Sequence, residues 1–571
     1  MDTWNWPLLD RYAGVSFGSL NRPPTPHLAR STPMSPTNEY ALTQEQEAIV
    51  DCQTNMKINA VAGSGKTTTL IEYARRQKTG SRGLYLAFNR TVREQAQQAF
   101  ARKGVRGVTI HTAHSLAYGR VIKQNSELLA SGSYSAFDLA NRMQKESLVV
   151  RCMPPTRRKA PWTAVAAHSL RLLAWYCNEP VTRIEDLNYN HLLRYDPLIS
   201  RRFADYFGAV IQAGAIWLWN QMDERSLKVT HDYYLKKFQL LAPQLRYDYI
   251  LFDEGQDASP TMLDVFSQQP HARRVIVGDS HQQIYGFRHA VNSLNQVDFA
   301  AYGLTQSFRF PPGIARQARR ALSLKQHIHP FLGETYTPQA IEGMGVDDAT
   351  ILAEPTCLQA LIGRTNLQLV SAAIDLLCIQ EVIGSVYFEG NFDTYTFMEN
   401  GAGLLDMVLL QQNRPREIKN PLLRSMGSLE ELGDYIDQTG DGQMKTALEL
   451  VLTYGDDLPH FIEQIRTAHL AQRFRPHADL IFSTVHRCKG LEYDQVTLCD
   501  DFIDQRKLAD YIGLLNQQQK AEAGGQPNHQ PVNPGSILEE INMLYVGLTR
   551  TKQGLSLPDS QYYLQRETLS V

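Results

Sequence analysis

The clearest indication of a chemical function in this chain comes from the residue types and spacing of the stretch AVAGSGKT, residues 60–67. They fit the pattern A/G-x-x-x-x-G-K-[S/T] between an apolar run and a helix-forming run, the strand–turn–helix setting that this pattern requires. Glycines allow the backbone to approach phosphate oxygens, Lys66 is expected to reach the β- and γ-phosphates, and Thr67 to ligate Mg²⁺. The pattern predicts an ATP-type nucleotide site contacted by Ala62, Gly63, Ser64, Gly65, Lys66, Thr67 and Thr68.

Two acidic residues follow another apolar run, in the stretch YDYILFDEGQD. Ligands bind at the carboxyl edge of parallel sheets, so Asp253 is expected to hold Mg²⁺ there, beside Glu254. Glu254 is expected to orient and deprotonate the water that attacks the γ-phosphate. These residues predict hydrolysis of the bound nucleotide.

A third stretch, RRVIVGDSHQQIYGFRHA, adds Asp279 and Gln282 after a further apolar run. Both are expected near the phosphates. Aromatic residues interleaved with an arginine follow within a few positions, a composition suited to stacking on the bases of a single strand. The candidate stacking residues are Tyr285, Phe287 and Arg288.

Seven short apolar runs could form the strands that position these residues: residues 56–62, 83–89, 247–254, 273–279, 357–364, 479–486 and 494–501. Each is followed by turn or helix-start residues, and such alternation predicts an α/β fold with parallel sheets covered by helices on both faces. Residues 116–234 and 380–475 interrupt this rhythm and read as mainly helical insertions. Residues 1–38 read as a disordered tail and 516–535 as a mobile loop.

The bulk composition describes an ordinary soluble protein. The 571 residues are 43% hydrophobic and 20% charged, with a net charge of −2, so any nucleic-acid surface must come from local clusters. Basic and aromatic residues gather at 154–162 and 200–203. The seven cysteines show no zinc-ligand spacing, and we expect neither a membrane span nor a signal peptide. An intracellular, soluble location is therefore expected.

In their order along the chain, these motifs resemble those of superfamily 1 DNA helicases of the UvrD/Rep type. The matching stretches begin with ALTQEQEAI, LYLAFNRTVREQA and TIHTAHSLAY and continue through DEGQD, LTQSFRF, ALIGRTN, STVHRCKGLEYDQV and EEINMLYVGLTRTK. Several wordings, such as HTAHSLAY and GDSHQQIYGFRHAVNSL, are similar to the helicase module of F-box DNA helicases. Residues 1–38 leave no room for an F-box, so no ligase partner is expected.

The resemblance implies two RecA-like domains, the first at 39–115 and 235–290 and the second at 291–379 and 476–571, each with one helical insertion. It places Gln46 and Phe308 at the adenine and Glu492 near the ribose. Catalytic roles fall to Lys66, Asp253, Glu254, Gln282, Arg309 and Arg550, with Gln256 and Gln282 linking the γ-phosphate to the grip on DNA. Contacts to DNA are implied for Phe88, Asn89, Thr112, His114, Tyr285, Phe287, Arg288, Arg364, Asn366 and His486.

The function that follows is an ATP- and Mg²⁺-dependent helicase acting on single-stranded and forked DNA, in repair or recombination and with proteins of those pathways as partners. The 3′-to-5′ direction is implied by the family alone. Two alternatives remain: a translocase that displaces bound proteins without unwinding, and an ATP-gated DNA-binding scaffold. His289, where the family usually has glycine, is the departure closest to the expected DNA contacts.

Overall fold

The computed structural model describes residues 41–130, 134–146, 162–189, 201–286, 292–345, 357–395, 403–439, 441–524 and 532–565. The predicted tail at 1–38 lies outside them. So do most of the basic stretch at 154–162 and three residues of interest, Phe287, Arg288 and His289.

Six parallel strands form the first sheet, in the order β3-β2-β4-β5-β1-β6. These strands are β1 (Met56–Ala60), β2 (Gly83–Ala87), β3 (Val108–Thr112), β4 (Tyr249–Phe252), β5 (Arg273–Gly278) and β6 (Ala300–Leu304). Helices α1 (Gln44–Asp51), α2 (Lys66–Arg75) and α3 (Arg90–Arg102) pack on one face. The other face packs against α11 (Pro260–Ser267) and the first helical insertion. Because β6 pairs along the whole of β1, the first domain extends beyond residue 290, where the sequence placed its end.

Five parallel strands form the second sheet, in the order β10-β11-β9-β12-β13. They are β9 (Gln359–Gly363), β10 (Val386–Phe388), β11 (Leu480–Thr484), β12 (Tyr493–Leu498) and β13 (Thr551–Ser556). A short pair, β7 (Gln306–Ser307) and β8 (Glu342–Gly343), lies apart from both sheets. The predicted α/β class with two parallel sheets is confirmed, although β10 lies inside the range that the sequence assigned to the second insertion.

The helices of the second domain pack around this sheet and against the first domain. They include α13 (Pro312–Ser323), α14 (Asn366–Ala373), α20 (Gln505–Ala523) and α21 (Pro534–Leu548). One hydrophobic core joins α13 and α21 to Val61, Ala62 and Ile284 of the first domain. The phosphate-binding loop therefore starts inside the core that connects the two domains.

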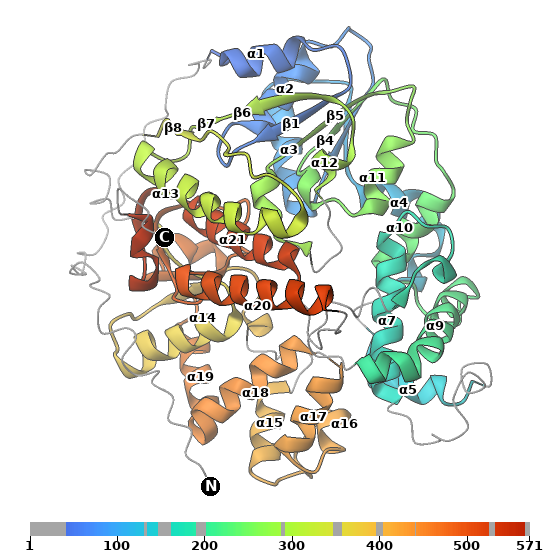
Figure 1. The fold of residues 1–571 in the computed structure, drawn as a ribbon, viewed down its shortest axis with the longest axis vertical. Helices are drawn as coiled ribbons and strands as arrows, with labels where there is room; N and C mark the ends of the chain where they lie inside the picture. The colour runs from blue at the N-terminus through green and yellow to red at the C-terminus, as the bar shows by residue number, and fades with distance from the viewer. Residues whose placement is uncertain are drawn as a thin grey trace.

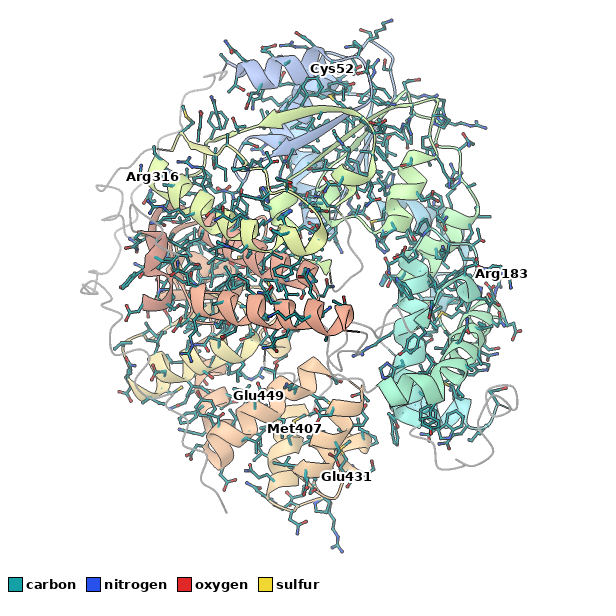
Figure 2. All side chains as sticks on the ribbon, viewed as in Figure 1. Cys52, Arg183, Arg316, Met407, Glu431 and Glu449 are labelled. Carbon is teal, nitrogen blue, oxygen red and sulfur yellow. The ribbon has the colours of Figure 1, made fainter. Side chains whose placement is uncertain are left out.

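Both insertions are mainly helical (Figure 1). The first contains α4 (Ala113–Val121), α5 (Ala136–Met143), α7 (Trp162–Asn178), α9 (Arg201–Asp223) and α10 (His231–Leu240). The second contains α15 (Gly403–Gln411), α16 (Pro421–Arg424), α17 (Leu429–Thr439), α18 (Gly442–Tyr454) and α19 (Leu458–Ala468). Figure 2 shows Arg183 on the first insertion and Met407, Glu431 and Glu449 on the second. The insertions contact each other through α7 and α17.

The prediction of a mobile loop at 516–535 is wrong for the first half of this range, because residues 516–523 continue helix α20. The stretch NQQQKAEA is polar, but glutamine, lysine, glutamate and alanine are strong helix formers. The helix ends at Gly524. Within the described part of the chain, no helix is both long enough and apolar enough to span a bilayer.

Candidate functional site

The phosphate-binding loop connects β1 to α2 in the conformation that its glycines permit. Gly63 and Gly65 have φ values of +75° and +79°, in the left-handed region where a side chain is strained. Helix α2 begins at Lys66, so its N-terminal N–H groups and positive dipole end face the loop. A Cβ on Gly63 would lie 2.5 Å from Arg309 Cβ, which leaves space for glycine alone. The loop thus has the geometry of an anion site and is in close contact with Arg309.

Lys66 and Glu254 face each other across this loop, as their motifs predict. Lys66 Nζ lies 3.4 Å from Glu254 Oε1, and both side chains are largely buried. Burial lowers the pKa of Lys66, but the nearby carboxylates of Glu254, Asp279 and Asp253 outweigh it and raise that pKa above its usual value. Burial raises the pKa of Glu254, but the positive charges of Lys66 and Lys489 lower it by more, so the net shift of this pKa is downward. Glu254 is therefore an ionised carboxylate, as a general base must be.

The two adjacent carboxylates have different environments. Burial, together with the charge of Glu254, raises the pKa of Asp253. Asp253 accepts hydrogen bonds from the Tyr85 hydroxyl and from the backbone N–H of Glu254. Glu254 itself has φ +54° and ψ +42°, a left-handed conformation that is uncommon for a residue with a side chain and typical of functional sites. In this conformation the carboxylate of Glu254 lies beside Lys66.

Glutamine side chains connect this carboxylate to the turn after β5. Gln256 Nε2 donates to Glu254 Oε2 at 2.5 Å, and Gln256 Oε1 accepts from the Asp279 N–H at 3.1 Å. Gln282 Nε2 donates to Asp279 Oδ2 at 2.8 Å. The acidic motif and the glutamine motif therefore form one buried hydrogen-bond network. The role that the resemblance implies for Gln256 and Gln282, linking the γ-phosphate to the grip on DNA, stays a prediction.

The second domain contributes two arginines to this network. Arg550 is 1% exposed, and its Nη2 lies 3.5 Å from Gln282 Oε1. Arg309 donates to Glu492 Oε1 at 2.8 Å and to the Thr549 carbonyl at 3.0 Å. Burial and then the charge of Arg309 lower the pKa of Arg550 to about 10. Two guanidinium groups close enough to affect each other form a site that an anion would stabilise.

The residues present fit ATP and Mg²⁺. Thr67 and Asp253 supply hard oxygen ligands of the kind that Mg²⁺ takes beside substrate phosphates, and both hydrogen-bond Tyr85. The described residues hold no group of three or more His, Cys, Asp or Glu that could form an all-protein metal cage. The hydroxyl of Ser64 in the loop is buried and lacks a hydrogen-bond partner. An unsatisfied buried hydroxyl at this position suits a phosphate ligand.

The expected adenine contacts lie on either side of the loop. Gln46 Nε2 donates to the Ser64 carbonyl at 3.4 Å, and Thr43 and Gln46 form the capping box that starts α1. The backbone N–H of Phe308 donates to the Gly63 carbonyl at 2.9 Å, while its side chain is 51% exposed. A large aromatic ring left this exposed beside a nucleotide loop offers a surface for a base.

Some of the candidate DNA-binding residues gather at the junction of the domains. The rings of Phe88 and Tyr285 are stacked with centroids 5.5 Å apart. Tyr285 also donates its hydroxyl to the His486 carbonyl at 2.9 Å. These three residues come from β2's end, the glutamine motif and the second domain, and together they form one aromatic cluster between the domains.

Other candidates have structural contacts of their own. Asn89 and Thr112 cap α3 and α4 with their side chains, and His114 Nε2 lies 3.7 Å from Asp232 Oδ1. Arg364 forms a bidentate ion pair with Glu540, and Asn366 donates to the Thr394 carbonyl at 3.3 Å. Their assignment to DNA stays a prediction. For Asn89 and Thr112, capping alone accounts for the side-chain position.

Three residues that the motifs did not single out complete the site. Tyr85 is buried in β2 and holds Asp253. Tyr545 of α21 donates to Asp279 Oδ2 at 3.1 Å and accepts from the Ala62 N–H at 3.3 Å. Lys489 pairs with the buried Asp257 and donates to the Gln282 carbonyl at 2.6 Å. All three stand in stretches that resemble helicase motifs, but a tyrosine in an apolar run reads as core and gives no signal of its own.

Two parallel sheets, a P-loop sequence after β1 of the first and two arginines of the second domain close to that loop place the chain among P-loop proteins with two such domains. Comparison with known proteins makes the class specific. The UvrD/REP helicase N-terminal domain matches residues 42–298, and the UvrD-like helicase C-terminal domain matches residues 411–561. The two matches together cover more than half of the chain, which therefore belongs to the UvrD/Rep family of DNA helicases.

Two curated relatives match nearly the whole chain. F-box DNA helicase 1 of Gallus gallus is 28% identical over 563 residues, which is 93% of this chain and 50% of that protein. F-box DNA helicase protein 1 of Schizosaccharomyces pombe is 29% identical over 567 residues, 93% of this chain and 58% of that protein. The chain thus spans between half and three-fifths of the length of these relatives. The resemblance to both the family and its F-box branch is confirmed.

Proposed function

We propose that this protein hydrolyses ATP with Mg²⁺ to move 3′-to-5′ along single-stranded DNA and to unwind duplex at forks, in DNA repair or recombination. The observation that supports this best is the convergence of Lys66 and Glu254 from one domain with Arg309 and Arg550 from the other. Both relatives are DNA helicases by name. The direction of movement and the pathway rest on the family alone.

Each side chain has a distinct task in the hydrolysis step. Glu254, kept ionised by Lys66 and Lys489, takes a proton from the attacking water. Lys66 and the two arginines stabilise the negative charge that develops on the transferring phosphoryl group. Mg²⁺ held by Thr67 and Asp253 would neutralise charge on the phosphates. Arg550 can act only when the second domain lies against the first, so hydrolysis requires closed domains.

Closure is connected to DNA through a short stretch of chain. Gln282, which contacts Arg550, lies three residues before Tyr285, which stacks on Phe88. A change at the phosphate therefore alters the aromatic cluster between the domains. Base stacking on such rings contributes ~1 to 3 kcal/mol per base. The upper end of this range exceeds the mean stacking free energy of a duplex step, ~1.4 kcal/mol. A stacked strand can thus be held while the duplex ahead opens.

Two assays on the wild-type protein test this function. ATP turnover is measured with and without single-stranded DNA, and unwinding is measured on forked duplexes with a 3′ or a 5′ loading strand. We expect turnover to rise with single-stranded DNA and unwinding to require the 3′ strand. Turnover that ignores DNA would contradict the motor, and unwinding from the 5′ strand would contradict the direction.

Lys66→Ala and Glu254→Gln test the site itself. Each should reduce turnover by at least about 10²-fold, because each removes a group that acts on the reacting phosphate or water. Lys78→Ala is the matched control, since Lys78 is an exposed lysine just beyond the end of the same helix α2. Equal rates for Lys66→Ala and Lys78→Ala would show that the loop is not the hydrolytic site.

A further inference from the structure

The second domain contacts residues 279–286 at nearly every position; we call these residues the seam segment. At its start, Tyr545 binds Asp279, and both Arg550 and Lys489 bind Gln282. Farther along, Asn542 donates to the Gln283 carbonyl and His486 to the Ile284 carbonyl. At its end, Glu539 accepts from the Gly286 N–H. The segment holds Gln282 at one end and Tyr285 at the other. One contact in it, at His281, involves a residue with no role in the site as described so far.

His281 is buried against Lys325, which lies just beyond the end of α13. Lys325 Nζ is 2.8 Å from His281 Nδ1, and Lys325 is 5% exposed. A charged amino group has no lone pair and can only donate, so Nδ1 is the acceptor when Lys325 is charged. Burial lowers the pKa of Lys325 to about 7, and burial with the charge of Lys325 lowers that of His281. The imidazole is therefore neutral, with its own proton on Nε2.

The other side of the same turn is fixed by the first domain. Asn59, on the strand that leads into the phosphate loop, accepts from the Ser280 N–H at 3.2 Å and donates to Gln339 Oε1 at 3.3 Å. Gln339 also hydrogen-bonds His281. The edge of the Tyr545 ring faces His281 at 6.0 Å between centroids. His281 is thus held on several sides, and Lys325 contacts it from the turn that follows α13.

Helix α13 connects two parts of the nucleotide site. Its N-terminal end follows Phe308 and Arg309, which contact the phosphate loop, and Lys325 lies just beyond its C-terminal end, against the turn that carries Gln282. A rigid helix of this kind makes the positions of Arg309 and Gln282 depend on each other. Breaking the contact at Lys325 would remove one of the contacts that hold the turn while leaving the contacts at Arg309 in place.

We propose that Lys325 is a positioning residue for ATP hydrolysis, which holds Gln282 in its reacting position through the hydrogen bond to His281. The proposal rests on the role of Gln282 in the proposed function. Lys325 contacts neither substrate nor reacting water and acts through the imidazole. Its loss should therefore weaken stabilisation of the transition state and leave the binding of ADP unchanged.

Lys325→Met tests this, because methionine fills a similar volume without a donor. At saturating ATP and single-stranded DNA, we expect kcat per folded molecule to fall roughly 10-fold, as the loss of a hydrogen bond from a charged donor predicts, while KM for ATP changes less than about 2-fold. Lys236→Met is the matched control, since Lys236 is a fully buried lysine whose partners are Gln239 and two backbone carbonyls of the first insertion. It should lower the melting temperature without changing kcat per folded molecule.

A double mutant shows whether Lys325 works through His281. In a His281→Leu background, Lys325→Met should cause little further loss, because the acceptor is already gone. Full additivity of the two losses would overturn the proposal, and so would a normal kcat in Lys325→Met.

Binding of ADP with aluminium fluoride, which mimics the transferring phosphoryl group, measures the same effect without turnover. Lys325→Met should weaken this complex by the same factor as kcat and leave ADP binding alone. If the wild type shows no DNA-stimulated turnover, the proposed function fails, yet the analogue measurement still decides the positioning role. Equal affinity of the analogue for both proteins would refute that role.

Discussion

Gly63→Ala should separate two costs at the phosphate loop, backbone strain and the contact between the domains. The residue has φ +75°, which costs an alanine about 1 to 2 kcal/mol. The new Cβ would also lie 2.5 Å from Arg309 Cβ and 2.7 Å from Ser307 Oγ, closer than such atoms approach. Relief requires the loop and the segment that carries Arg309 to move apart. Such overpacking costs about 1 to 3 kcal/mol.

The second cost falls on the closed arrangement of the domains, because only there does Arg309 lie against the loop. At 1.4 kcal/mol for each factor of ten, about 1 to 3 kcal/mol reduces the equilibrium constant for domain closure roughly 5- to 150-fold. We expect kcat for DNA-stimulated ATP hydrolysis to fall by up to that factor. Stopped-flow phosphate release under saturating ATP is the assay.

Gly104→Ala is the matched control. Gly104 has φ +66°, close to that of Gly63, and its Cβ would meet nothing within 4 Å. Both variants should therefore lose about the same stability through strain, measured as similar shifts in melting temperature, while only Gly63→Ala should lose turnover. Equal turnover in the two variants, corrected for folded fraction, would refute the claim that contact between Arg309 and the loop belongs to the hydrolysing state.

Two further predictions concern buried cations. Arg550→Lys keeps the positive charge but loses the planar fork that contacts Gln282. We therefore expect ATP turnover to fall about 10³-fold or more with little change in ATP affinity. Single-turnover rates near wild type would contradict the role of this arginine. Lys325, which faces Asp279 and His281, has its pKa lowered by burial to about 7 in the folded protein and an ordinary value of 10.5 when unfolded. The unfolded chain thus binds more protons between these values, and stability should rise with pH there, by about 2 kcal/mol from pH 7 to pH 9. Lys325→Met should lack this rise when the pH dependence of unfolding is compared with wild type.

The strands that the sequence predicted and those it missed differ in a physical way. All seven predicted runs contribute strands, and several of them, such as β2, β4 and β11, are buried throughout, as the continuously apolar character of a parallel strand covered on both faces requires. The strands β6 and β13, with sequences AAYGL and TKQGLS, lie at sheet edges and are largely exposed or half-buried. Their extended form comes from pairing with a neighbour rather than from their own composition. Long-range pairing of this kind leaves little trace in a short stretch of sequence.

The residues of the candidate site also divide into those that the sequence could predict and those that it could not. Lys66 with Glu254, and Gln282 with Arg550, could be predicted from motifs because their chemistry dictates the residue types. Tyr85 and Tyr545 could not, since a tyrosine in an apolar stretch is equally suited to a hydrophobic core. Only the fold shows that each hydroxyl reaches a carboxylate of the site.

The pairing of Arg309 with Glu492 bears on how closure is controlled by the substrate. In this structure Arg309 is held by Glu492, whose side chain is 41% exposed, and by the Thr549 carbonyl. The charge of Arg309 contributes to lowering the pKa of Arg550, so the two guanidinium groups lie close enough to repel each other. A triphosphate that enters between them removes this repulsion and competes with Glu492 for Arg309. The carboxylate thus released is at the position that the family resemblance assigns to the ribose. We therefore expect this ion pair to neutralise Arg309 before the substrate binds and to supply two ligands for the substrate when it breaks, so that domain closure would depend on the whole nucleotide rather than on its phosphates alone.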